Sequence, residues 1–303
     1  MIVSNDDLYQ RLLDSKLPEK TFWKVYCSHA MSYDSYHGKI WRAKNKIIDM
    51  SHLFQHDIGK PLALTGDWII IGDVQLPTTD YDFAILPAAI AKRHLKRPRQ
   101  LLIAGDLVNM DCFSTYANEI GLPGFRQEIQ AAKAIVGEWL KFFDRIVYTA
   151  GNHERRLSKQ ANGALLMEDL ISIIGSRMET SNFDRVTIDT EQGVYTVPHG
   201  SDYSINQLTV ADQLAQKYRT HIISWHEHHL AKGFDRYGHN IIVNGGGLFN
   251  EWYMSYVQLN TSKKARMKNG FVMLRDGYPY IFGKEPFTNW NDWLGSKIVK
   301  AAA

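Results

Sequence analysis

Residues 101–109 read LLIAGDLVN: four apolar residues, a glycine and then an aspartate. The arrangement recurs as WIIIGDVQ at residues 68–75 and as IVYTAGNHE at residues 146–154. Short apolar runs without alternation are typical of strands buried on both faces. Residues 83–95 and 126–143 lie between them and are predicted to be amphipathic helices, which indicates a largely parallel sheet. Ligands on such a sheet bind just beyond the strand ends, where all three runs place polar residues.

The second half of the chain is richer in strands. Five further runs are predicted to be strands: 194–197, 221–224, 241–244, 271–274 and 278–282. Residues 275–277 form a good hairpin turn between the last two, and one helix is predicted over 205–217. The pattern predicts an α/β fold, a two-sheet αββα sandwich in which outer helices cover two sheets packed face to face.

The first 62 residues differ from the rest and read as short helices, which predicts two parts: a helical N-terminal unit, 1–62, and a main domain, 63–303. The third helical piece carries several basic residues, namely His37, Lys39, Arg42, Lys44 and Lys46. It resembles a small helix-turn-helix unit, so nucleic-acid binding is one interpretation. A packing or dimerisation module is the other.

The polar residues at the strand ends are of types that bind divalent metals. They are Asp73, Gln75, Asp106, Asn152, His199, His226 and His228. A single such residue is usually a turn or capping residue, but the ordered set favours metal binding, since hard cations prefer oxygen and borderline ones also accept imidazole. A carboxylate can bridge two ions about 3.5–4 Å apart, and such a pair can acidify a water into a hydroxide that attacks phosphorus in line. A histidine that is not a ligand can then protonate the leaving oxygen.

In this order the motifs resemble those of the calcineurin-like metallophosphoesterase superfamily: D-x-H, G-D-x-x-[DN], G-N-H-[DE], a lone H, and G-H-x-H. The resemblance covers residues 67–282 and implies that Asp106 bridges two metal ions. The remaining ligands would form two sets, Asp73, Gln75 and His228 on one ion and Asn152, His199 and His226 on the other. His153 would be the general acid, oriented by Asn109. The stretch GNHERRL at 151–157, together with a helical N-terminal unit, resembles phage-borne members.

Two positions depart from the family pattern. Gln75 stands where the family usually has histidine, and its neutral amide is a weaker donor. We therefore expect that site to bind its metal less tightly and to lean towards manganese, with iron, zinc, nickel and magnesium as alternatives; otherwise His229 or His239 substitutes. The protein serine/threonine phosphatase branch has an aspartate and then an arginine where this chain has Asn109 and Met110, which argues against that branch.

Several features bear on the substrate. Arg155 and Arg156 follow the third motif and could clamp a phosphate bidentately, although a solvated helix face is the simpler interpretation. The basic stretch 92–99 and the N-terminal helices fit a nuclease or another nucleotide phosphodiesterase. The aromatic group Trp252, Tyr253 and Tyr256 is interpreted as core rather than as a platform for base stacking. The alternatives are a phosphomonoesterase acting on a small molecule or a protein, and a non-catalytic metal-binding or DNA-binding scaffold.

The bulk properties are those of an ordinary globular protein. The 303 residues are 45% hydrophobic and carry a net charge of +3, which is too small to imply a polyanionic partner. There is no secretory signal and no run near the roughly 18 apolar residues that span a bilayer, so we expect no membrane association. Two cysteines make no disulfide framework, and a cytoplasmic setting is expected. The sequence does not give the oligomeric state.

Overall fold

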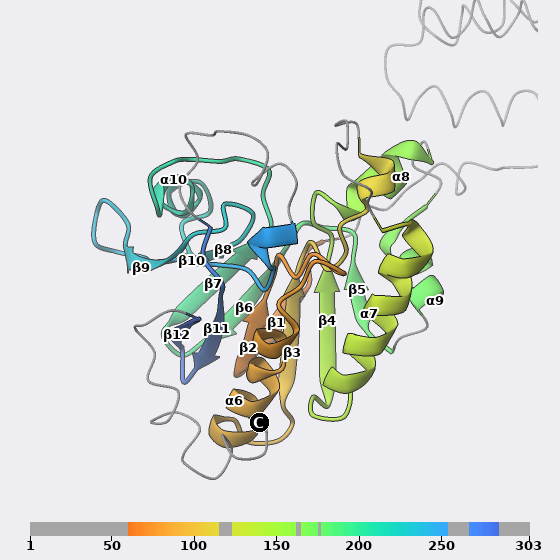
Figure 1. Cartoon of the computed structure of the whole chain (residues 1–303). Helices are drawn as coiled ribbons and strands as arrows, with labels where there is room; N and C mark the ends of the chain where they lie inside the picture. Colours follow the sequence, from red (N-terminus) through yellow and green to blue (C-terminus); the bar gives the residue numbers. More distant parts are fainter. Residues whose placement is uncertain (1–59, 115–122, 162–164, 175–176, 254–266, 285–303) are drawn as a thin grey trace, which may run out of the picture. The chain divides into compact units, whose positions relative to one another are not determined.

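The computed structural model describes residues 60–114, 123–161, 165–174, 177–253 and 267–284 (Figure 1). The described residues from Pro61 onward belong to one compact unit. Nearly all of the predicted helical unit, 1–62, lies outside the described residues, so its helices and its nucleic-acid binding stay predictions.

Two six-stranded sheets form the centre of the domain. The first has the order β12–β11–β2–β3–β4–β5. Its strands are β2 (Trp68–Ile71), β3 (Gln100–Ala104), β4 (Arg145–Thr149), β5 (Glu179–Ser181), β11 (Gly270–Arg275) and β12 (Tyr278–Gly283). β2 to β5 are parallel to one another, as the sequence predicts, and β11 and β12 add an antiparallel edge.

The second sheet is mixed, with the order β1–β6–β7–β8–β10–β9. Its strands are β1 (Ala63–Thr65), β6 (Arg185–Thr190), β7 (Gly193–Pro198), β8 (His221–Ser224), β9 (Leu230–Phe234) and β10 (Ile241–Gly245). β7, β8 and β10 are parallel. Their carboxyl ends therefore meet at one edge of this sheet, as those of β2, β3 and β4 do in the first.

Alternation along β2 shows how the layers are built. Trp68 and Ile70 pack in the core between the two sheets, whereas Ile69 and Ile71 pack in the core beneath the outer helices. All four are fully buried, and each aliphatic side chain of this kind contributes about 1.5–3 kcal/mol. A run of consecutive isoleucines is thus explained by a sheet that is covered on both faces.

Helices cover the outer face of each sheet (Figure 1). They are α5 (Tyr81–Ala84), α6 (Leu86–His94), α7 (Phe125–Trp139), α8 (Glu154–Gln160), α9 (Met167–Ile174) and α10 (Thr209–Tyr218), with short 3-10 turns η1 (Asp111–Phe113) and η2 (Glu251–Tyr253). α6, α7 and α9 pack on the first sheet and α10 on the second. This confirms the predicted αββα sandwich. None of the helices in the described ranges has the length and apolar character needed to cross a bilayer.

Candidate metal centre

The candidate ligands lie on irregular loops that leave the strand ends. The loops after β2 and β3 run side by side, since Asp73 N donates to Gly105 O (3.2 Å) and Gln75 N donates to Asp106 O (3.0 Å). Five candidate ligands, Asp73, Gln75, Asp106, His226 and His228, have φ between 46° and 89°. A non-glycine residue in this left-handed conformation lowers the stability of the fold by about 1–3 kcal/mol. So much backbone strain in one place points to a functional site.

Two glycines allow the loops to meet. A Cβ on Gly105 would lie 2.5 Å from the His199 ring, and one on Gly151 would collide with the carboxylate of Asp106. A side chain at either position would push His199 away from Asp106. The glycines of the second and third motifs are therefore needed for close approach.

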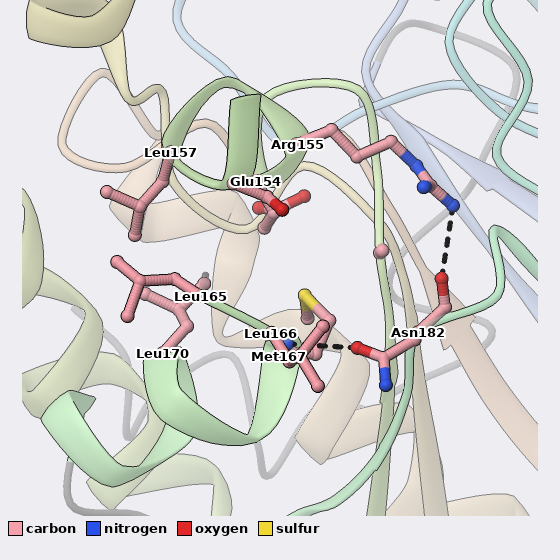
Figure 2. A pocket seen from close by; sticks show the side chains of 10 residues that line it. Glu154, Arg155, Leu157, Leu165, Leu166, Met167, Leu170 and Asn182 are labelled. Carbon is pink, nitrogen blue, oxygen red and sulfur yellow. Dashed lines mark hydrogen bonds between the residues drawn. The ribbon is translucent and has the colours of Figure 1, made fainter. Parts of the chain in front are cut away.

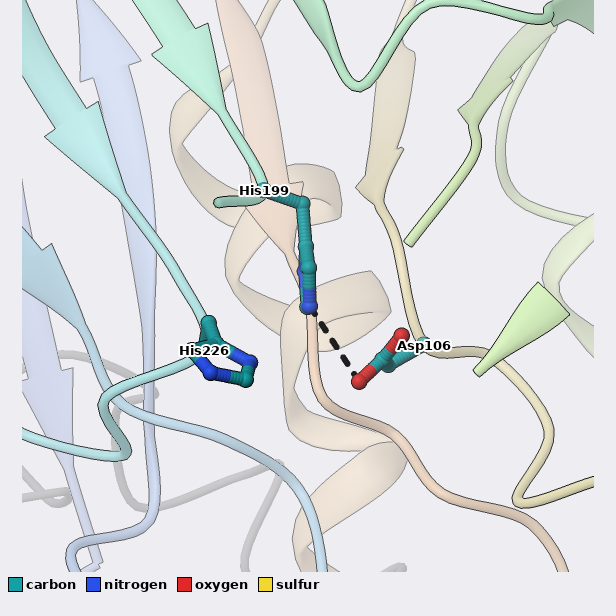
Figure 3. Close-up of side chains that lie close together, drawn as sticks. All are labelled: Asp106, His199 and His226. Atoms are coloured by element: carbon teal, nitrogen blue, oxygen red, sulfur yellow. Dashed lines mark ion pairs between the residues drawn. The ribbon is translucent and has the colours of Figure 1, made fainter. Parts of the chain in front are cut away.

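The first donor cluster joins both sheets. Asp106, His199 and His226 offer ligand atoms that all lie within 4.8 Å of one another (Figure 3). His199 Nδ1 lies 2.7 Å from the carbonyl oxygen of Ala104, so it carries the ring proton and donates it there. Nε2 then faces Asp106 Oδ2 at 3.2 Å and Asn152 Oδ1 at 3.2 Å. In the metal-free protein a second proton on Nε2 holds these atoms together, and a divalent cation can take the place of that proton.

The charges of the cluster agree with this interpretation. Burial lowers the pKa of His199, but the carboxylates of Asp106 and Asp73 outweigh it and raise the pKa to about 10. Burial likewise opposes ionisation of Asp106, yet His153 and His199 hold its pKa well below the usual range. In a metal-free protein a second proton on His199 would supply the positive charge that the oxygens require. A divalent ion supplies the same charge without that proton.

Asp73 belongs to a second donor cluster, and its Oδ2 accepts a hydrogen bond from His226 N over 2.9 Å. His228 Nε2 lies 3.0 Å from Asp73 Oδ1 and 3.2 Å from Gln75 Nε2, and all three side chains are buried. Rotation of the Gln75 amide by 180° would turn its oxygen to the same point. His229 Nε2 instead contacts Ser204 O at 2.9 Å, and His239 lies in the turn between β9 and β10. The structure thus places Gln75 against His228 and gives His229 a different partner.

His153 lies between the first cluster and Arg156. Its backbone N–H donates to Asp106 Oδ1 (2.9 Å), and its Nε2 lies 3.6 Å from Asp106 Oδ2. Arg156 Nη2 lies 3.0 Å from the same His153 Nε2, and Nη1 donates to Asn109 O and Asp111 Oδ1. The side-chain amide of Asn109, predicted to orient His153, donates to Thr78 Oγ1 over 3.0 Å. Burial lowers the pKa of His153 to about 4, so in this arrangement its ring is neutral near pH 7.

The two arginines of the third motif point in different directions. Figure 2 shows Arg155 extending from α8 towards Asn182, where its Nη2 donates to the carbonyl over 3.1 Å. The small pocket beside it is mainly apolar, with Leu157, Leu166 and Met167 in its wall. Arg156 faces the candidate metal centre and Arg155 does not. Phosphate contact by either stays a prediction.

Glu154 was not assigned a role from the sequence. Its buried carboxylate accepts hydrogen bonds from four backbone N–H groups: Asp106, Leu107 and Val108 at 2.9–3.3 Å, and Gly151 at 2.9 Å. Glu128 on α7 similarly accepts from Met110 N and Asp111 N. These glutamates fix the loop that carries Asp106. Only the position of Glu154 within the third motif signals this role in the sequence, and nothing there distinguishes Glu128.

Comparison with known families gives the same assignment as the geometry. The sequence profile described as calcineurin-like phosphoesterase matches residues 60–268, which is most of the chain. The chain belongs to the calcineurin-like phosphoesterase family. Members are metal-dependent phosphoesterases, and the acceptor atoms around Asp106 fit a divalent metal. No curated protein matches this chain.

Solved structures with a similar chain path are distant in sequence. Vps29 from Chaetomium thermophilum is 11% identical, with a TM-score of 0.37 over 73% of this chain and 95% of that one. A 5'-nucleotidase precursor from Thermus thermophilus is 11% identical, with a TM-score of 0.31 over 78% of this chain and 57% of that one. A protein of unknown function from Aquifex aeolicus is 13% identical, with a TM-score of 0.30 over 57% and 83%. At these scores the fold assignment rests on the family match and the strand order.

Proposed function

We propose that this chain is a two-metal phosphoester hydrolase that acts on a phosphodiester of a nucleic acid or nucleotide. The observation that carries the proposal is the convergence of His199 Nε2, Asp106 Oδ2 and Asn152 Oδ1 on one buried place that a divalent cation can occupy. His226 completes this set, and Asp73, Gln75 and His228 form a second set nearby. When bound, two divalent ions would acidify a water and neutralise charge on the phosphoryl oxygens.

The protein's own contribution begins with orientation. Ala104 O fixes the His199 tautomer, so that Nε2 points into the site, and Glu154 holds the Asp106 backbone in its strained conformation. Because both groups are buried, they need no reorganisation when a substrate arrives. We expect Asp106, whose backbone carbonyl accepts a hydrogen bond from Gln75 N, to be the shared ligand.

Proton donation to the leaving oxygen is assigned to His153. In the free protein its Nε2 receives a hydrogen bond from Arg156, so this nitrogen cannot carry a proton at the same time. We propose that a phosphoryl oxygen takes over the guanidinium of Arg156 when the substrate binds, because charge-assisted bidentate contacts with phosphate are stronger than the contact with a neutral imidazole. His153 Nε2 is then free to take up a proton from solvent. Burial lowers the pKa of this ring, Asp106 raises it and Arg156 lowers it, so engaging Arg156 with the phosphoryl group favours that proton.

Gln75 supports one alternative of another class. If its neutral amide holds no metal, the chain would bind a single ion and serve as a scaffold.

The basic stretch, residues 92–99, spans the end of α6 and the loop before β3. It therefore lies at the opposite end of β3 from Asp106, and it does not line the candidate metal centre.

Metal analysis combined with two model substrates separates these possibilities. The full chain is stripped with a chelator, reloaded with manganese, and assayed on p-nitrophenyl phosphate and on bis-p-nitrophenyl phosphate. The proposal predicts hydrolysis that requires metal and favours the diester. A preference for the monoester would select the phosphomonoesterase alternative. One bound ion without hydrolysis of either ester would select the scaffold.

A further inference from the structure

Two large aromatic side chains lie on the surface after the last strand of the second sheet. Trp252 is 74% exposed and Tyr253 is 67% exposed, both on the 3-10 turn η2. The interpretation of these residues as core is therefore wrong for both, and Tyr256 lies outside the described residues. A tryptophan this exposed has given up most of the burial that normally accompanies its large ring, and exposed apolar surface of this kind often marks a binding site.

The aromatic turn is anchored next to the metal centre. Phe249 packs its ring 4.6 Å, between centroids, from that of His228, and it pairs with Thr79 in an isolated antiparallel bridge. Trp252 follows three residues later, so its Cα lies within about 11 Å of that of Phe249. A few nucleotides span that distance, since a strand of B-form DNA advances by about 3.4 Å per nucleotide.

Hydrogen bonds fix the segment that carries these rings. Asn250 N donates to Thr78 O over 2.6 Å, and Asn250 Oδ1 accepts from Trp252 N over 3.1 Å. Asn269 Nδ2 holds the carbonyl oxygen of Phe249 at 2.7 Å. Thr78 Oγ1 also accepts a hydrogen bond from the side-chain amide of Asn109. The aromatic turn and the loop that carries Asp106 are therefore both hydrogen-bonded to Thr78. The rings are exposed on a backbone that is tied to the site.

We infer that Trp252 and Tyr253 form a stacking platform for a nucleobase of the substrate, next to the phosphoester bound at Asp106. Every base presents a π face, so such a platform would accept any base and would confer preference for nucleotides without sequence specificity. The inference rests on the proposed function, because the phosphoryl group must lie at the metal centre for a neighbouring base to reach η2. The base could belong to a free nucleotide or to a single strand.

The first test compares substrates that differ only in the base. A nucleoside 5'-monophosphate is paired with ribose 5-phosphate, and a dinucleotide with the same diester carrying two abasic sugars. In the full chain, Trp252→Ala should raise KM for the base-bearing member of the hydrolysed pair by about tenfold. It should leave kcat, and the KM for the base-free member, nearly unchanged. Trp252→Phe should retain most of the affinity for the base-bearing member.

The matched control is Tyr237→Ala. Tyr237 is 64% exposed in the turn between β9 and β10, at the opposite end of β10 from the metal centre. This variant should behave like wild type on all four substrates. Equal KM values for base-bearing and base-free substrates in wild type, or no change in Trp252→Ala, would overturn the platform.

A second readout does not depend on turnover. Fluorescence anisotropy, on the metal-loaded full chain in a His153→Asn background that slows turnover, measures the affinity for a labelled ten-nucleotide single strand and for a labelled mononucleotide. Trp252→Ala should weaken binding of at least one probe by about tenfold, and the probe affected identifies the source of the base. Unchanged binding of both would refute the platform. Failure of wild type to hydrolyse any phosphoester with metal would refute only the proposed function, because this binding assay would still decide the role of Trp252.

Discussion

Replacing Glu154 with glutamine should loosen the loop that carries Asp106. In the native structure one carboxylate oxygen accepts from Leu107 N and Val108 N, and the other accepts from Asp106 N and Gly151 N. In glutamine one of these oxygens becomes an NH2 group, which donates and cannot accept. Two buried backbone N–H groups therefore lose their partner in either orientation of the amide.

The magnitude follows from those two donors. A buried donor left unsatisfied costs about 1–3 kcal/mol, so the pair should cost about 2–6 kcal/mol. Burial raises the pKa of Glu154 and the Asp106 charge raises it further, so the native carboxylate is itself destabilised in its charged form. Glutamine removes that penalty, so we expect the free energy of unfolding to fall by an amount near the lower end of this range.

The assay is urea unfolding of wild type and Glu154→Gln, with Glu168→Gln as control. Glu168 is exposed on α9, so its replacement should change the free energy of unfolding by less than about 0.5 kcal/mol. Metal affinity should also fall by about 10- to 100-fold in Glu154→Gln, as it does when a group that supports a ligand is lost. Unchanged unfolding and unchanged metal affinity in this variant would refute the positioning role of Glu154.

Three further substitutions test individual residues of the site. Asp106→Asn should abolish paired metal binding and activity, because the shared oxygen loses its charge; two tightly held ions per chain, counted by mass spectrometry of metals, would contradict this. Gln75→His should tighten one site in calorimetric titration with manganese, and unchanged or weaker affinity would remove Gln75 from the ligands. His153→Asn should keep both ions but slow turnover by about 10²–10⁴-fold, most for esters with poor leaving groups. A rate ratio that stays flat across a leaving-group series would exclude His153 as the acid.

Strands marked by a continuous apolar run or by a hairpin turn could be predicted, but very short or alternating strands could not. Continuous runs such as Trp68–Ile71 are confirmed as β2 because burial on both faces demands apolar residues throughout. β6 was missed although it alternates, with Val186 and Ile188 buried between polar neighbours. β1 and β5 have only three residues each, and their pairing with β6 and β4 defines them rather than any local pattern.

The candidate site shows the same division. Residues that follow strands, such as Asp106 and His199, could be named because their positions in ordered motifs carry the signal. Partners were missed where the contact joins distant parts of the chain. Arg156 meets Asn109 and Asp111 across 47 and 45 residues, and Asn109 turns to Thr78 across 31 residues. No local pattern encodes which of several nearby polar groups a side chain will choose.

Counting metal ions against activity tests the central claim most directly. The full chain is stripped by a chelator and titrated with manganese, while bound ions per chain and the rate of bis-p-nitrophenyl phosphate hydrolysis are followed together. The account predicts no activity without metal and a rate that reaches its maximum as the second ion binds. Full activity in the stripped protein, or a rate that is complete with one ion bound, would contradict a two-metal centre built on Asp106.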